Sequence, residues 1–371
     1  MHFLESAAYE RVRPLFQGLD AHLAITATLE GHVPGQVYVD DTTAPRVALL
    51  WVNGRIFLAG TPPSDAPLRF LDQSLADWGR RTGRDSFVLH YHPSAWSERI
   101  LAGLAGRYPI SELRHHYTLG ALRHNWRERL PAGFVLRPVD QDLLAETGLR
   151  NLERVTEEMC SERPSIEEFL AHSFGVCAVH GDEIAGWCMS EYNSGDRCEV
   201  GIEVVAAYQR RGLATALASA LIEEAQRRDI DRIGWHCWAR NEASIATALA
   251  VGLVKAGEEA VINLFTEPVI ALGVHGNLCL REDRYNEALS WYEQALQHED
   301  APVWVYINAG NAHAAAGNEE QAFRYLHEAV DHGFGDIAYL QKTRFLKTLH
   351  GTAGWAVLLE RLENVTNSMV R

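Results

Sequence analysis

The stretch that most constrains this chain is residues 198–226, where the signals of a strand, a tight turn and a helix follow one another without a break. Its sequence is CEVGIEVVAAYQRRGLATALASALIEEAQ. Residues 198–205 are rich in β-branched residues, which favours a strand. Residues 213–226 are rich in alanine and carry apolar residues at helical spacing. A strand that leads directly into a helix predicts an α/β fold at this place.

The turn between this strand and this helix is suited to a phosphate. Residues 209–214 read Gln-Arg-Arg-Gly-Leu-Ala. The first backbone N–H groups of a helix have no partner within it, and the helix dipole is positive at that end. Gly212 and Ala214 would let a pyrophosphate approach closely, and Arg210 and Arg211 add positive charge. An ordinary junction with solvated arginines has the same pattern, so the turn alone leaves both interpretations open.

Two motifs resemble those of one enzyme family. The pattern Gln-x-x-Gly-x-Ala at residues 209–214, after a valine-rich strand, resembles the acetyl-CoA-binding motif of the GNAT acyltransferases. The pattern Asn-x-x-Ser at residues 241–244, followed by Gly-Leu at 252–253, resembles the second signature of that family. Together the motifs cover about residues 134–266, and they predict a GNAT-type mixed central sheet flanked by helices.

The resemblance implies which residues hold acetyl-CoA, the cosubstrate of the family. Main-chain groups of the turn would contact the pyrophosphate, N–H groups around Val205 would hold the thioester carbonyl, and Asn241 would hydrogen-bond the cofactor. The strand at 231–238 would splay from the central strand and admit the pantetheine arm. The expected cofactor-binding residues are Val204, Val205, Gln209, Arg210, Arg211, Gly212, Leu213, Ala214, Thr215, Asn241 and Ser244.

Direct acetyl transfer to an amine, which the resemblance implies, requires a base. A free alkylamine titrates near the lysine value of about 10.4, so a carboxylate must take its proton near neutral pH. Glu199 and Glu203 are evenly spaced on the expected central strand and therefore share one face. We expect Glu199 first and Glu203 second as this base. A salt bridge or a solvated strand face is the alternative for each.

The general acid is not identified by the sequence. Many relatives carry a tyrosine seven residues after the motif asparagine, and here that position is Ala248. Water could protonate the leaving thiolate instead. Glu153, Glu157 and Glu158, on helices expected at 143–160, could draw in cationic substrates, although a solvated acidic face is the favoured interpretation.

Composition excludes several classes of partner. The chain has 371 residues and a formal net charge of −15, which disfavours binding to nucleic acid or to an anionic membrane surface and favours cationic small molecules. No apolar run approaches the roughly 20 residues needed to cross a bilayer, and residues 1–13 lack the pattern of a signal peptide. We therefore expect a cytoplasmic protein.

Cysteine and histidine patterns predict no metal site. The six cysteines show no Cys-x-x-Cys pair and no zinc-type spacing, so we expect reduced, mostly buried thiols. Histidines at 90, 92, 115 and 116 make a metal site conceivable. No Asp or Glu accompanies them in the pattern, and a structural role is favoured. Trp187, Trp235 and Trp238 could form an aromatic wall for a cationic amine, but core packing is favoured for at least two of them.

Three domains are expected. Residues 1–130 predict an N-terminal α/β domain, whose length and mixed order are compatible with a degenerate GNAT half. Residues 131–267, after the linker Pro131-Ala132-Gly133, form the expected acetyltransferase domain. Expected elements of the first domain are helices at 9–29, 68–79 and 94–106, and strands at 36–40, 46–52, 56–60, 86–90 and 115–119.

Residues 268–371 predict helices only, with an internal repeat. Gly276-Asn277, Ala288 and Ala295 recur 34 residues later as Gly310-Asn311, Ala322 and Ala329. This period, with small residues where helices approach closely, resembles tetratricopeptide repeats. Residues 337–364 would form a capping hairpin. Such an array implies a possible protein partner.

The layout of the first 266 residues resembles the GNAT group that includes zwittermicin A resistance proteins. The first hypothesis is therefore an acetyl-CoA-dependent N-acetyltransferase that acts on a primary amine of a small, antibiotic-like molecule. A second hypothesis is acetylation of a protein or peptide amine, with the helical repeats docking the substrate. A third is a non-enzymatic adaptor that senses acyl-CoA.

Overall fold

The computed structural model describes residues 1–61 and 64–369. These residues divide into two compact units that draw on interleaved stretches of the chain. The first consists of Met1–Leu71, Phe87–Gly103 and Ser111–Asn263, and the second of Asp72–Ser86, Leu104–Ile110 and Leu264–Arg371.

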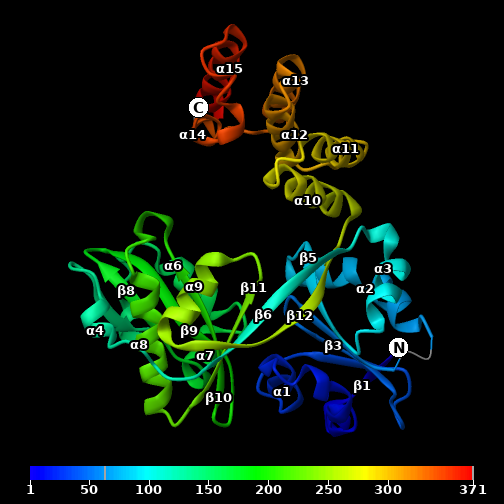
Figure 1. Ribbon diagram of the computed structural model, residues 1–371, viewed down its shortest axis with the longest axis vertical. Coiled ribbons are helices and arrows are strands. Elements are labelled where there is room, and N and C mark those ends of the chain that lie inside the picture. The colour runs from blue at the N-terminus through cyan, green and yellow to red at the C-terminus, as the bar shows by residue number, and fades with distance from the viewer. Residues whose placement is uncertain (62–63, 370–371) are drawn as a thin grey trace. The chain divides into compact units, whose positions relative to one another are not determined.

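One mixed sheet forms the centre of the first unit (Figure 1). Its strands follow the order β1-β2-β3-β4-β5-β12-β6-β11-β10-β9-β8-β7. Their bounds are β1 His2–Leu4, β2 Gln36–Val39, β3 Val47–Val52, β4 Arg55–Gly60, β5 Ser86–His92, β6 Ile110–Leu119, β7 Val135–Pro138, β8 Gly175–His180, β9 Glu183–Ser194, β10 Arg197–Val204, β11 Arg232–Trp238 and β12 Leu253–Phe265. The mixed sheet with its flanking helices confirms the α/β class expected from the sequence.

The strands of the sheet do not follow chain order in its middle. The long strand β12 lies between β5 and β6, and β6 pairs antiparallel with β11. Figure 1 shows β6 and β12 as two long neighbouring strands across the sheet. Strands from residues 1–130 and strands from residues 131–267 therefore belong to a single sheet.

Helices cover this sheet where its strands present apolar side chains. The helices within residues 1–267 are α1 Leu23–Leu29, α2 Ala66–Thr82, α3 Trp96–Gly103, α4 Trp126–Arg129, α5 Gln141–Ala145, α6 Leu152–Met159, α7 Ile166–His172, α8 Leu213–Arg227 and α9 Glu242–Val251, with 3₁₀ turns at Ser6–Arg11, Arg13–Leu19, Ala105–Arg107 and Ala206–Tyr208. Helix α8 buries its apolar face against Cys198 and Val200 of β10 and against Trp235 of β11. Strand β3 is buried along its whole length, as its unbroken apolar sequence requires.

Two expected helices are wrong in their extent. The apolar pattern at 9–29 forms two 3₁₀ segments and the short helix α1, because Pro14 cannot donate a hydrogen bond and Gly18 lies against the His92 ring. The segment at 143–160 is divided into α5 and α6. Asn151, with φ of +66°, begins α6 in a left-handed conformation that a continuous helix does not contain.

The second unit is mainly helical. Its helices are α10 Pro268–Arg281, α11 Tyr285–Ala295, α12 Val303–Ala315, α13 Glu319–Asp331, α14 Ile337–Lys342 and α15 Ala353–Met369, with a 3₁₀ turn at Arg344–Leu346. A Cβ atom on Gly276 would lie 2.4 Å from the Tyr292 ring, and one on Gly310 would lie 2.9 Å from Leu326. Both contacts join positions that match at a spacing of 34 residues, so the glycines mark equivalent close approaches between paired helices. Membership of the tetratricopeptide class stays a prediction.

The other small residues of the repeat are buried. Ala288, Ala295, Ala322 and Ala329 are each 0% exposed. Their burial agrees with the expectation that small residues stand where helices approach closely. Across the described residues, no helix is both long and apolar enough to cross a membrane.

We expect Gly276→Ala to destabilise the paired helices. The added methyl group would force the buried Tyr292 ring to move, which costs about 1–3 kcal/mol of unfolding free energy. Urea denaturation followed by circular dichroism at a helical wavelength measures the change. Gly106→Ala is the control, because its Cβ would meet nothing within 4 Å. Equal stability of the two variants would contradict the close approach.

Candidate active site

A cleft opens where β10 and β11 separate. These strands pair in parallel only from Arg197↔Arg232 to Glu199↔Gly234, although β10 continues to Val204 and β11 to Trp238. Beyond the last pair lies a cleft of about 650 Å³, with the end of β10 on one side and the start of α9, the helix that follows β11, on the other. Among the described residues, none of β11 itself lines the cleft. The cleft leaves room for an extended ligand.

The sequence-predicted cofactor residues gather around this cleft. All of them except Arg211 belong to its lining: Val204, Val205, Gln209, Arg210, Gly212, Leu213, Ala214, Thr215, Asn241 and Ser244. Arg211 instead donates from Nη2 to the Ala207 carbonyl at 3.1 Å. The other lining residues are Arg154, Ile202, Glu203, Ala206, Tyr208, Ala243 and Thr247.

The N-terminus of α8 faces the cleft without a side-chain cap. Gly212 occupies the N-cap position with φ of +81°, and no side chain among the described residues caps this end. Arg210, two residues earlier, is also left-handed, with φ of +59°. Because a helix N-terminus carries unpaired N–H groups and partial positive charge, this end of the cleft can bind an anion.

The opposite wall of the cleft is the N-terminus of α9. Asn241 is its N-cap, and Asn241 Oδ1 accepts a hydrogen bond from Ser244 N at 3.1 Å. Ser244 Oγ accepts a hydrogen bond from Trp235 Nε1 at 2.9 Å. These bonds fix both side chains at the cleft and leave the Asn241 Nδ2 group as the side-chain donor for a ligand.

Backbone groups at the end of β10 are partly used by the sheet. The Val205 N–H, expected to hold a carbonyl, donates to the Ala185 carbonyl at 2.9 Å. The irregular pairing in β10 falls between Glu199 and Val200, opposite β9, rather than near Val205. An oxyanion site at Val205 would therefore require this hydrogen bond to change.

The two glutamates expected as bases share one face of β10 but differ in surroundings. Cys198 and Val200 pack on the α8 side, so Glu199 and Glu203 point away from it. Glu203 lines the cleft and forms an ion pair with Arg154 of α6. The Arg154 guanidinium also lies over the Trp187 ring, 5.3 Å from its centroid. Glu203 is therefore the carboxylate at the cleft.

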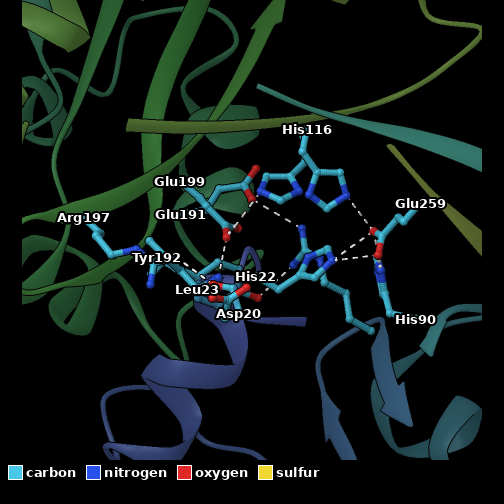
Figure 2. A network of polar contacts seen from close by, with 12 residues as sticks. Asp20, His22, Leu23, His90, His116, Glu191, Tyr192, Arg197, Glu199 and Glu259 are labelled. Atoms are coloured by element: carbon cyan, nitrogen blue, oxygen red, sulfur yellow. Dashed lines mark hydrogen bonds and ion pairs between the residues drawn. The ribbon is translucent and has the colours of Figure 1, made fainter. Parts of the chain in front are cut away.

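Glu199 lies outside the cleft lining, in a buried polar network (Figure 2). It is 6% exposed and accepts a hydrogen bond from the Leu23 N–H at the start of α1. His236 Nε2 of β11 lies 3.5 Å from its carboxylate. Burial raises the pKa of Glu199, and the Leu23 hydrogen bond acts in the opposite direction.

A group of partly buried charges lies near Glu203, and of these charges the sequence pattern indicated only Glu158. Burial raises the pKa of Glu158 to about 7, reinforced by the nearby charge of Glu191. Burial also raises the pKa of Glu191 to about 7, against the opposing charge of Arg55. A Cβ on Gly201 would lie 2.4 Å from Glu191 Oε1, so this strand glycine makes room for the carboxylate. Gly201, a glycine inside the expected strand, was the one sequence feature that could have indicated this close approach.

Arg55 connects this group to the N-terminal part of the sheet. It donates to Glu162 Oε1 at 2.5 Å, to Tyr192 Oη at 2.8 Å and to Glu191 Oε2 at 3.3 Å. Glu162 also accepts a hydrogen bond from Tyr192. These partners are at least 107 positions away from Arg55 in the sequence, so a local sequence pattern cannot predict the contacts.

The aromatic and thiol groups follow the structural expectation. Trp187 and Trp235 are almost fully buried, which confirms core packing for two of the three tryptophans. The Arg114 guanidinium lies over the Trp238 ring. Five of the six cysteines are buried, and all six are free.

No side chain is assigned as the general acid. Ala248, at the position where many relatives carry a tyrosine, is buried. The Tyr208 hydroxyl in the cleft already donates a hydrogen bond to Glu183 at 2.8 Å.

Comparisons with known proteins agree on one family. A family model of GNAT acetyltransferases matches residues 13–258. The chain is similar to an uncharacterized N-acetyltransferase, YdfB, of Bacillus subtilis (strain 168), at 24% identity over 253 residues, which cover 67% of this chain and 93% of that protein. The GCN5-related N-acetyltransferase-like protein of Streptococcus suis 89/1591 has a similar fold, with a TM-score of 0.55 and 22% identity over 70% of this chain and 99% of that one.

The raised pKa of Glu158 predicts a measurable pH dependence of stability. Its pKa in the folded protein, about 7, lies above the value of 4.5 for an unperturbed glutamate. Between these values the folded state binds more protons than the unfolded state, so the contribution of Glu158 falls as pH rises. The unfolding free energy of wild type minus that of Glu158→Gln should fall by about 1–3 kcal/mol between pH 5 and pH 7.5.

Urea denaturation at several pH values measures this difference. Glu157→Gln is the matched control, because Glu157 is the exposed neighbour of Glu158 on α6. A difference for Glu158→Gln that does not vary with pH, or one that the control reproduces, would contradict the burial of that carboxyl.

Proposed function

Because this chain belongs to the GNAT acetyltransferase family, whose model matches residues 13–258, we propose that it moves an acetyl group from acetyl-CoA to a primary amine of a small, antibiotic-like molecule. The observation that carries the proposal is the cleft between the end of β10 and the start of α9, with the uncapped N-terminus of α8 in its lining. The sequence resemblance to zwittermicin A resistance proteins favours the small-molecule class, and the expected cytoplasmic location stays a prediction.

The cleft fits the chemistry of acetyl-CoA. Its pyrophosphate needs an anion site, which the free N–H groups after Gly212 and the charge of Arg210 would supply. Its pantetheine arm is extended and needs a narrow gap between strands, which exists beyond the Glu199↔Gly234 pair. Asn241 would donate from Nδ2 near the thioester end, because its Oδ1 already caps α9.

Glu203 is the proposed base. Of the two strand glutamates expected for this role, it is the one that lines the cleft. It would accept a proton from the substrate ammonium, and the freed amine would attack the thioester carbonyl. The carbon–sulfur bond would break as the carbon–nitrogen bond forms, and the attacking nitrogen would release its second proton to water. The CoA thiolate would take a proton from water, so the one proton left over is the proton held by Glu203. An incoming ammonium group would replace Arg154 as the cationic partner of Glu203.

The charge around Glu203 supports a cationic acceptor. Glu158, Glu162 and Glu191 lie close enough to one another that the charges of neighbours raise the pKa values of Glu158 and Glu191. The charge of Glu203 also raises the pKa of Glu158. Arg55 offsets part of this negative charge. A positively charged amine would be attracted to this side of the cleft, and an acidic substrate would be repelled.

A protein or peptide amine is the second candidate acceptor. The helices α10 to α13 favour it, because their equivalent close approaches match a 34-residue repeat of the kind used to bind peptides. An amine panel assayed by thiol release separates the two: we expect aminoglycoside-like and other small polyamines to react faster than peptides with free N-termini. Faster reaction with the peptides would reverse the order of the candidates. Binding of acetyl-CoA without turnover of any amine would favour the acyl-CoA-sensing adaptor.

We expect Gly212→Val to weaken acetyl-CoA binding by at least about tenfold. A β-branched residue at φ of +81° is strained, and its side chain would stand at the anion end of the cleft. Isothermal titration calorimetry measures the affinity. Gly181→Val is the matched control, since Gly181 also has positive φ, of +62°, with no atom near its Cβ, but lies in the β8–β9 turn. Equal affinities of the two variants would argue against pyrophosphate binding at α8.

Glu203→Gln should lower kcat by about 10²–10⁴-fold, the usual contribution of a general base, while acetyl-CoA affinity stays unchanged. Thiol release with saturating amine measures the rate. The loss should be smaller at high pH, where more of the amine is already unprotonated. A variant with wild-type kcat at neutral pH would exclude Glu203 as the base and return attention to Glu199.

A further inference from the structure

A row of histidines and carboxylates crosses the centre of the sheet, outside the lining of the cleft. Its members come from adjacent strands: His90 from β5, Glu259 from β12, His116 from β6, His236 from β11 and Glu199 from β10. His22, the residue before α1, covers them, as Figure 2 shows. The proposed acetyl transfer uses none of the four histidines.

Three imidazole nitrogens converge on one carboxylate oxygen. Glu259 Oε1 lies 2.8 Å from His90 Nδ1, 2.9 Å from His22 Nε2 and 3.0 Å from His116 Nε2. Ligand atoms of His22, His90 and Glu259 all lie within 4.8 Å of one another. Two histidines and one carboxylate are a ligand set that first-row transition metals use.

The contact of His116 does not have the geometry of a hydrogen bond. Its Nε2 is buried and lacks a hydrogen-bond partner among the described residues, although it lies 3.0 Å from Glu259. His90 Nε2 and His236 Nδ1 are buried without partners in the same part of the chain. Buried polar atoms without partners are costly, so this cluster is not fully satisfied by the protein alone.

We propose that His22, His90 and Glu259 bind one divalent transition metal ion of the zinc type, with His116 beside Glu259 on the β6 side. Zinc ligands of this kind lie about 2.0–2.2 Å from the ion and therefore about 3.3 Å from one another. The observed contacts of 2.8 and 2.9 Å need to widen by only a few tenths of an ångström. The ion ties the start of α1 to β5 and β12, so its role is structural.

The sequence pattern missed this set because its carboxylate is remote. Glu259 is 169 positions from His90 and 237 positions from His22. The absence of an Asp or Glu near the histidines was the reason to expect no metal site, and the placement of β12 between β5 and β6 supplies the carboxylate instead.

Metal binding to the intact protein tests the proposal. Wild-type protein stripped with a chelator should bind one equivalent of Zn²⁺ by calorimetry and elemental analysis. Binding should weaken by about 100-fold or more in His90→Ala and in Glu259→Gln, because each removes a ligand. His115→Ala is the matched control. His115 neighbours His116 on β6, but its ring nitrogen Nδ1 shares a hydrogen bond with the Tyr117 hydroxyl. The zinc affinity of this variant should equal that of wild type.

A spectroscopic measurement on wild type alone decides the matter if a variant fails to fold. Co²⁺ added to the stripped protein should give visible absorption bands of a low-symmetry nitrogen and oxygen site, which one equivalent of Zn²⁺ abolishes. Absence of these bands, or Zn²⁺ binding that His90→Ala leaves unchanged, would overturn the proposal and identify the cluster as neutral imidazoles that donate to Glu259. Acetyl-CoA affinity, measured separately, reports on the cleft and not on this site.

Discussion

The structure depends on the point at which β10 and β11 stop pairing. Hydrogen-bonded strands stand too close together to admit a ligand, so the three pairs that end at Glu199↔Gly234 determine where a cofactor can enter. Beyond that point the turn before α8 and the start of α9 face each other across open space. Glu199, in the last pair, and His236, two residues beyond Gly234 on β11, belong instead to a buried network. A cleft and a buried polar centre therefore both lie at the point where the pairing ends.

That polar centre exists because strands distant in sequence alternate in the sheet. The position of β12 between β5 and β6 places Glu259 beside histidines from both neighbours. Arg55 in turn reaches Glu162 and Glu191 from β4. Burying this many charges is expensive unless each finds a partner, and burial is the main cause of the raised pKa values of Glu191 and Glu199.

Local patterns predicted the cleft much better than the buried network. The strand, glycine turn and helix at 198–226 are contiguous, so their spacing alone brought nearly all expected cofactor residues to one cleft. The shared face of Glu199 and Glu203 also followed from the two-residue period of a strand. The two-residue period of the strand could not predict that α1 covers Glu199 and leaves Glu203 at the cleft. Leu23, at the start of α1, is 176 positions away from Glu199 in the sequence. The role of Glu259 was hidden for the same reason. Helix lengths failed where Pro14 and Asn151 interrupt apolar patterns.

A crystal structure of the protein with acetyl-CoA tests the central claim most directly, because that claim concerns where the cofactor lies. The pyrophosphate should contact the backbone N–H groups at Gly212 to Thr215, and the pantetheine arm should pass between β10 and β11 beyond Glu199 and Gly234, with the acetyl group on the Glu203 side. Density for the cofactor at any other place, or a complex in which β10 and β11 pair along their full length, would contradict the account.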